Sequence, residues 1–292
     1  MKRLIDFSQR DPSPFAKWEL TTCSGHGREG FESSYEGGVL RLQAETPLGA
    51  AFGIAQLARA ARAGHLAEWL GKRQPFFVLR PVRLRTPVSQ WELFCEQLVM
   101  LGYNAVVSSD APLELCHAYG LQVISPQPGM DYLLWESRTQ LERSPERAKT
   151  ESELVMEELR RAEQAAGAAR LIFSLPLLNQ TVADAQARWL GALCDAASIC
   201  TTIAFPACGG THSIWEALRR SPDCSSTPLL PLVDLSSSEE LERVFCRMER
   251  HPFAGALISA ESFVDQALFW VAAQRQWSSR AAPLLECTFR CS

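Results

Sequence analysis

The sequence lacks several features that would each assign a class of protein. No apolar run is followed by a glycine-rich phosphate loop, which removes the usual reason to expect a nucleotide-binding sheet. The 29 Lys and Arg residues are outnumbered by 33 Asp and Glu residues and form no basic block. No stretch of roughly 18 residues is apolar enough to span a bilayer, and the start has no apolar run of signal-peptide length. We therefore expect a cytoplasmic protein with no nucleic-acid or membrane partner.

Metal and disulfide patterns are also missing. None of the ten cysteines forms a CxxC pair, and the histidines show neither HxH nor HExxH spacing. No metal and no cofactor is expected. Several cysteines lie inside apolar helical stretches, where Cys behaves as a small hydrophobe. Free thiols in a reducing compartment are the simpler interpretation.

From Leu79 onward, short apolar runs alternate with amphipathic stretches whose apolar positions recur every three or four residues. Continuous apolar strands separated by helices indicate a parallel sheet buried on both faces. Eight such strands in roughly 210 residues predict an α/β fold of the (β/α)8 TIM type over residues 76–292, with an open doubly wound sheet as the competitor. The expected strands are 79–86, 104–109, 121–125, 170–177, 201–207, 227–235, 255–261 and 283–289.

Residues 1–75 predict a small α+β domain ahead of the barrel. Two expected strands, 17–25 and 31–45, precede a helix, and Gly37 and Gly38 suit a tight hairpin inside the second. Thr46 offers an N-cap oxygen and Pro47 fits the first helical position. Residues 71–75 are the expected junction with the barrel.

The order of these pieces resembles glycoside hydrolases, notably α-glucuronidases and β-N-acetylhexosaminidases. The stretch YEGGVLRLQAETPLGAAFGIAQL (35–57) resembles part of their small N-terminal domain, and FVLRPVR (77–83) resembles the start of their barrel. LGYNAVV (101–107) and AYGLQVIS (118–125) are similar to the second and third strands of the α-glucuronidase barrel. QALFWVAAQRQW (266–277) resembles the last helix of such enzymes. The resemblance implies a barrel that binds a carbohydrate ligand.

One departure from that resemblance bears on activity. The resembled families place an acid at or just beyond strand 4, whereas the fourth expected strand, 170–177, carries no carboxylate. The expected loops are also short. Both features favour a protein that binds without hydrolysing.

In a barrel of this type the site forms at the carboxyl ends of the strands. Asp234 and Glu261 lie at the ends of neighbouring expected strands, and we expect this pair to be catalytic, in keeping with the late-strand carboxylates of α-glucuronidases. Asp110, Asp131 or Glu136 would supply the acid that protonates the leaving group. The alternative is that Asp234 caps the next helix and that Glu261 is a first-turn acid favoured by the helix dipole.

Expected substrate-binding residues stand at other strand ends, and Trp135 in the long loop after 121–125 could stack on a sugar ring. Its alternative role is to anchor that loop to the barrel rim. Cys208 and His212 suggest a nucleophilic pair, against which a tight turn capped by Thr211 is the simpler interpretation. The charged helix 145–163 is interpreted as a solvated face. The expected substrate-binding residues are Arg85, Gln127, Trp135, Asn179 and His212.

Two functions follow from these patterns. The first is a glycoside hydrolase that cleaves a small oligosaccharide or uronoside. The second is a catalytically inactive relative that binds a carbohydrate or a protein through the same face. The sequence leaves the sugar, the stereochemical outcome and the oligomeric state open.

Overall fold

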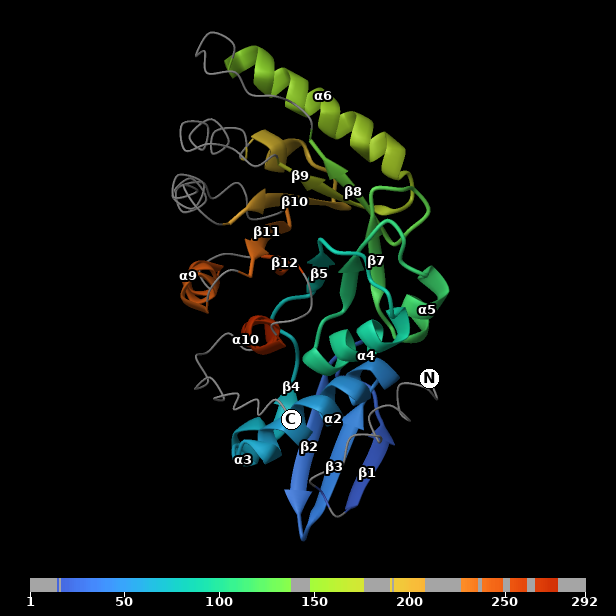
Figure 1. Cartoon of the computed structure of the whole chain (residues 1–292), viewed down its shortest axis with the longest axis vertical. Helices are drawn as coiled ribbons and strands as arrows, with labels where there is room; N and C mark the ends of the chain where they lie inside the picture. The colour runs from blue at the N-terminus through green and yellow to red at the C-terminus, as the bar shows by residue number, and fades with distance from the viewer. Residues whose placement is uncertain are drawn as a thin grey trace.

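The computed structural model describes residues 15, 17–137, 148–175, 190, 192–207, 227–235, 238–248, 253–261 and 266–277. Within these ranges the chain forms two parts, a small four-stranded sheet and a closed barrel of eight parallel strands (Figure 1). The α/β fold class predicted from the sequence, a TIM-type barrel preceded by a small domain, is confirmed. The exact boundary between residues 75 and 76 stays a prediction.

The small sheet has the strand order β1-β3-β2-β4, with β1 parallel to β3 and the other two pairs antiparallel. Gly37 and Gly38 close the β2–β3 hairpin with positive φ angles of 57° and 81°. The Thr46 side chain accepts a hydrogen bond from the amide of Gly49 and so caps α2 as predicted. The elements are β1 (Lys17–Thr22), β2 (Phe31–Glu36), β3 (Val39–Ala44), α2 (Pro47–Arg62), α3 (Leu66–Trp69) and β4 (Gly71–Arg73).

Strand β4 lies within the expected junction, residues 71–75. Its residues Gly71–Arg73 pair with β2 and therefore belong to the small sheet. Helix α2 lies between this sheet and helix α4 of the barrel (Figure 1), so it packs against both parts of the chain.

The barrel strands follow one another in chain order from β5 to β12, and β12 pairs with β5 to close the ring. The barrel elements are β5 (Pro81–Leu84), α4 (Trp91–Leu101), β6 (Ala105–Val107), α5 (Leu113–Ala118), β7 (Gln122–Ser125), β8 (Tyr132–Glu136), α6 (Ala148–Ala166), β9 (Arg170–Ser174), β10 (Thr201–Pro206), β11 (Leu229–Asp234), α9 (Ser238–Met248), β12 (Leu257–Ala260) and α10 (Gln266–Trp277).

Two separate hydrophobic clusters result from the alternation of side chains along the strands. The inner cluster fills the barrel and includes Tyr132 and Leu134 of β8. The outer cluster lies between the strands and the helices, and it takes in Leu133 and Trp135 of the same strand. Successive residues of β8 therefore face the barrel interior and the helix layer in turn.

Strand β8 is the main correction to the sequence analysis. The segment that was expected to be part of a long loop is the fourth strand of the barrel, paired with β7 and β9. The expected strand 170–177 is therefore the fifth strand, β9, which runs from Arg170 to Ser174. The expected strand 283–289 lies outside the described residues, and the barrel closes without it because β12 pairs directly with β5.

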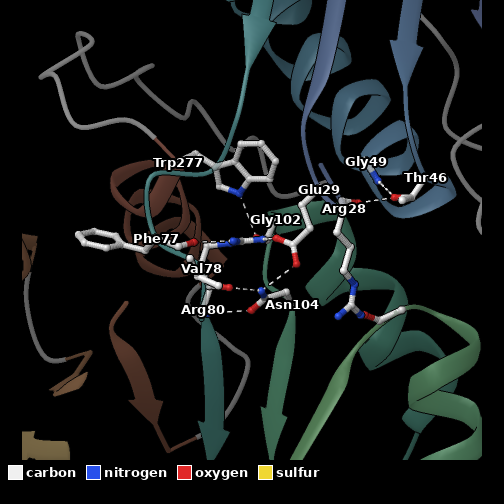
Figure 2. Close-up of polar contacts among 11 residues, drawn as sticks. Arg28, Glu29, Thr46, Gly49, Phe77, Val78, Arg80, Gly102, Asn104 and Trp277 are labelled. Carbon is white, nitrogen blue, oxygen red and sulfur yellow. Dashed lines mark hydrogen bonds and ion pairs between the residues drawn. The ribbon is translucent and has the colours of Figure 1, made fainter. Parts of the chain in front are cut away.

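A buried polar network joins the two parts of the chain (Figure 2). The guanidinium of Arg80 is fully buried and pairs with Glu29, which comes from the loop before β2. Asn104 binds the other oxygen of Glu29 at 2.9 Å and accepts a hydrogen bond of 2.7 Å from the backbone amide of Arg80. The carbonyl of Gly102 accepts from Arg80 Nε at 2.8 Å and from Trp277 Nε1 at 3.0 Å. These bonds tie the small domain to the amino-terminal end of the barrel.

Six cysteines lie within the described ranges, and all six are free thiols: Cys23, Cys95, Cys116, Cys194, Cys200 and Cys246. None of the helices in this part of the chain is both long enough and apolar enough to cross a membrane.

Candidate active site

A pocket of about 380 Å³ opens at the carboxyl ends of strands β5 to β8. This is the end of a parallel barrel at which active sites form, because the loops after the strands converge there. Its charged lining consists of Arg83, Arg85, Asp110 and Glu136. We call this end of the barrel the mouth. It includes the pocket and also Asp234 and Glu261, the two acids that pair with Arg85.

Glu136 is the last residue of β8, the fourth strand, and its side chain is 56% exposed. Because Tyr132 and Leu134 face the barrel interior, the alternation along the strand turns Glu136 to the same side. Its Oε1 lies 2.7 Å from Nη1 of Arg83, which comes from β5. The fourth strand of the barrel therefore does carry a carboxylate. This strand is β8, which precedes the segment 170–177 that was expected to be the fourth strand.

Arg85 brings together the two acids that were expected to form the catalytic pair. Its Nη2 lies 2.6 Å from Oδ1 of Asp234, the last residue of β11, and its Nη1 lies 3.8 Å from Oε2 of Glu261, which follows β12. Thr86 fixes the backbone of Glu261, since both its amide and its hydroxyl donate to the Glu261 carbonyl, at 3.0 and 2.8 Å. One guanidinium thus bridges acids from the seventh and eighth strands.

Asp110 follows β6 and lines the pocket with an exposed side chain. Its carboxylate accepts a hydrogen bond from the hydroxyl of Ser108, and its amide donates to the same hydroxyl at 3.3 Å. This local turn holds Asp110 on the second strand end, on the opposite side of β5 from Asp234.

Asp131 is the candidate acid that the structure places elsewhere. It precedes β8, at the opposite end of the barrel, where its Oδ2 accepts from the amide of Val123 at 2.7 Å and contacts Nε2 of His117 at 2.8 Å. The expectation that Asp131 could supply the acid is therefore wrong.

The expected substrate-binding residues separate into three groups. Arg85 lines the pocket, and Gln127 is exposed beyond β7, outside the pocket lining. Trp135 faces the helix layer, where its indole nitrogen donates to Glu158 of α6 at 3.1 Å. Asn179 and His212 lie outside the described residues, as does Cys208.

Sequence reasoning missed Arg83 and misplaced Glu136. Arg83 and Arg85 are two apart in a strand, and that spacing puts both on one face, which was a usable signal. In the described part of the chain, no group of three or more His, Cys, Asp or Glu side chains could hold a metal ion. The mouth therefore offers carboxylate and guanidinium groups as its chemistry.

No protein-family model and no curated protein sequence matches the chain. Solved structures do match its fold. The N-acetyl-β-hexosaminidase of Streptomyces plicatus aligns with a TM-score of 0.57 and 10% identity over 95% of this chain and 83% of that one. A GH138 enzyme that targets pectin rhamnogalacturonan II aligns with a TM-score of 0.55 and 11% identity over 97% of this chain. The chain spans 49% of the length of that enzyme.

A family 20 exo-β-N-acetylglucosaminidase of Vibrio harveyi gives a TM-score of 0.53 at 8% identity, over 89% of this chain and 64% of that one. At such identities the likeness concerns the fold alone. The chain has the fold of these glycoside hydrolases, a barrel preceded by a small domain. The resemblance noted in the sequence is thereby confirmed at the level of fold.

Proposed function

We propose that the chain is a glycoside hydrolase that cleaves a small oligosaccharide or uronoside at the mouth. The observation that carries this proposal is the presence of four strand-end acids at the carboxyl end of the barrel. Asp110 and Glu136 line the pocket, and Asp234 and Glu261 pair with Arg85, which also lines it. Glycoside hydrolysis needs two carboxyl groups on either side of the scissile bond, one to protonate the leaving oxygen and one to activate water or attack the sugar.

Glu136 is the candidate proton donor and Asp234, assisted by Glu261, is the candidate base or nucleophile. Glu136 comes from the fourth strand and Asp234 from the seventh, so they approach the mouth from different sides of the barrel. Asp110 is the second candidate for the proton donor, because it lines the same pocket. The missing acid on strand 4 no longer argues against hydrolysis.

The two arginines favour a uronoside over a neutral sugar. Arg83 and Arg85 are 42% and 52% exposed, and both line the pocket. A guanidinium binds a carboxylate through two parallel hydrogen bonds, so a uronate can replace Glu136 or Asp234 as its partner. The carboxylate released by that exchange is then available to the glycosidic bond.

A screen of aryl glycosides and aryl uronosides tests the proposal. The Glu136→Gln and Asp234→Asn variants should each lower kcat/KM by about a hundredfold or more, the usual range for loss of an acid or base. Glu261→Gln tests the auxiliary role of Glu261. Glu114→Gln, an exposed acid on α5, is the matched control and should leave kcat/KM unchanged. Full activity in both Glu136→Gln and Asp234→Asn would overturn the site.

Substrates with different leaving groups separate the two roles. A nitrophenolate leaves without help, whereas an alkyl alcohol needs a proton from the acid. Glu136→Gln should therefore impair alkyl glycosides more than nitrophenyl glycosides, and Asp234→Asn should impair both alike. The reverse pattern would exchange the two assignments.

A second function is favoured by the ion pairs themselves. Glu136, Asp234 and Glu261 all have an arginine within 4.0 Å, so the mouth is already compensated in charge. Such a site suits a carbohydrate-binding protein without catalytic activity. Calorimetric titration with the same uronosides distinguishes the two, since binding without turnover supports this alternative.

A further inference from the structure

Helix α6 carries an acid on its buried face, beside Val155, Leu159 and Ala162. Glu158 is 8% exposed, although the neighbouring acids Glu153 and Glu157 are exposed. Taking a carboxylate out of water costs free energy unless hydrogen bonds compensate it. A leucine would suit this position better if packing were its only role.

Both oxygens of Glu158 are used, and they reach the two residues on either side of Glu136. Oε1 accepts from the indole nitrogen of Trp135 at 3.1 Å, and Oε2 accepts from the hydroxyl of Ser137 at 2.6 Å. Hydrogen bonds to a charged acceptor are about twice as strong as neutral ones. The end of β8 is thus held to α6 at the positions directly before and after Glu136.

The alternation along β8 makes this contact relevant to the mouth. Leu133 and Trp135 face the helix layer, whereas Tyr132 and Leu134 face the barrel interior. Fixing Trp135 and Ser137 on the outer side therefore fixes the direction in which Glu136 leaves the strand on the inner side. The amide of Ser137 also donates to the carbonyl of Ser174 at 2.9 Å, which extends the pairing with β9 past the strand end.

We propose that Glu158 is a positioning residue for Glu136, acting from the helix layer through Trp135 and Ser137. The inference rests on the proposed function, because it assigns Glu136 a role that needs a fixed direction. A displacement of about 1 Å at a reacting group can cost about a hundredfold in rate. Glu158 stays outside the pocket lining and does not touch substrate.

The kinetic test compares Glu158→Met with Glu157→Gln, its exposed neighbour on the same helix. Glu158→Met should lower kcat by about tenfold to a hundredfold and leave KM within about twofold, because Arg83 and Arg85 still line the pocket. Glu158→Gln keeps the side-chain length and one carbonyl acceptor, so its kcat should lie between those of the wild type and Glu158→Met. Glu157→Gln should change neither constant.

Removing the two donors gives a version of the test that leaves the acid in place. Trp135→Phe and Ser137→Ala each delete one hydrogen bond, and the double variant should match Glu158→Met in kcat. Adding Glu158→Met to the double variant should then lower kcat no further, because the partners act as one unit. Additive losses, or a normal kcat with Glu158→Met in a protein whose Glu136→Gln variant is impaired, would overturn the positioning role alone.

Amide hydrogen exchange supplies a readout that needs no substrate. The amides of residues 132–137 should exchange at least about tenfold faster in Glu158→Met, with those of β5 and β11 unchanged. Unchanged exchange at 132–137 would overturn the proposal. If the wild type cleaves none of the glycosides, the proposed hydrolase function fails, and the exchange experiment still decides whether Glu158 fixes the end of β8.

Discussion

The two ends of strand β5 pair arginines with carboxylates in opposite surroundings. At the amino-terminal end, Arg80 is fully buried and its partner Glu29 is 10% exposed. At the mouth, Arg83 and Glu136 are 42% and 56% exposed. Arg80, Arg83 and Arg85 thus lie within six residues of one another. Arg80 belongs to the buried network that joins the two parts of the chain, which we call the junction from here on, and Arg83 and Arg85 line the pocket at the mouth.

Burial decides what each pair contributes. A buried pair leaves a charge without compensation if one partner is removed, which costs about 3–5 kcal/mol, whereas an exposed pair contributes about 0–1 kcal/mol. Burial lowers the pKa of Arg80, and the nearby carboxylate of Glu29 opposes that shift. The rings of Trp277 and Phe52 lie 5.1 and 5.5 Å from the guanidinium carbon. The pair at the amino-terminal end is thus enclosed by protein, whereas the arginines of the mouth are open to solvent.

The largest expected effect comes from Arg80→Met. The substitution leaves Glu29 buried without its cation and the carbonyl of Gly102 without one donor, so the free energy of unfolding should fall by about 3–5 kcal/mol. Urea unfolding followed by tryptophan fluorescence measures it. Adding Glu29→Leu should recover part of the loss, because it removes the uncompensated charge. A loss below about 1 kcal/mol in Arg80→Met would break the contrast between the two ends.

Gly102→Ala should have the next largest effect. Gly102 has a φ of +96°, and a Cβ there would lie 2.6 Å from Nε1 of Trp277. The strained backbone costs about 1–2 kcal/mol, and crowding of the indole adds about 1–3 kcal/mol.

Gly129, in the loop between β7 and β8, is the matched control for this prediction. Its φ is +94°, but a Cβ at this position would have nothing within 4 Å, so Gly129→Ala carries the backbone strain alone. The difference in unfolding free energy between the two variants isolates the packing at the junction. Equal losses would show that the indole moves away at no cost.

Alkaline pH should weaken the junction through Tyr103. Burial raises the pKa of this phenol well above its usual value, while Arg80 lowers it by a smaller amount. The folded state therefore holds the phenol proton more tightly than the unfolded state does. The resulting contribution to the free energy of unfolding is fully present below about pH 10, and it falls by about 1.4 kcal/mol per unit as the pH rises further. Unfolding free energies between pH 9 and 11 measure this slope. Tyr103→Phe should reduce the slope by about 1.4 kcal/mol per pH unit and leave the part that comes from Tyr119, whose pKa is also raised by burial, and Tyr35→Phe, at an exposed tyrosine, should not change it.

The sequence was sufficient to predict the barrel because most strands are continuous apolar runs. It was insufficient for β8, whose residues YLLWE contain no β-branched side chain and follow a turn-like stretch with two prolines and a glycine. What makes this segment a strand is its pairing with β7 and β9, a contact between distant parts of the chain. The error removed Glu136 from strand 4 and created the apparent absence of an acid there.

The same limit applies to charged side chains. Glu158 is one of many acids on a helix that the pattern describes as a solvated face, and only the tertiary structure shows that Trp135 and Ser137 bury it. Glu29 and Arg80 are 51 residues apart, and no local pattern links them. Asp234 and Glu261 were predictable, because acids at the ends of neighbouring parallel strands must come close together.

The smallest expected effect is on stability in Arg83→Met, the counterpart of Arg80→Met on the same strand. Because both partners of the Arg83–Glu136 pair are half-exposed, the unfolding free energy should fall by less than about 1 kcal/mol, and by still less in about 0.5 M salt. Uronoside binding, measured by calorimetry, should weaken far more than stability does, since the guanidinium would be the group that exchanges Glu136 for the ligand carboxylate. A stability loss as large as that of Arg80→Met would mean that the mouth, like the junction, is held by its arginines as structure.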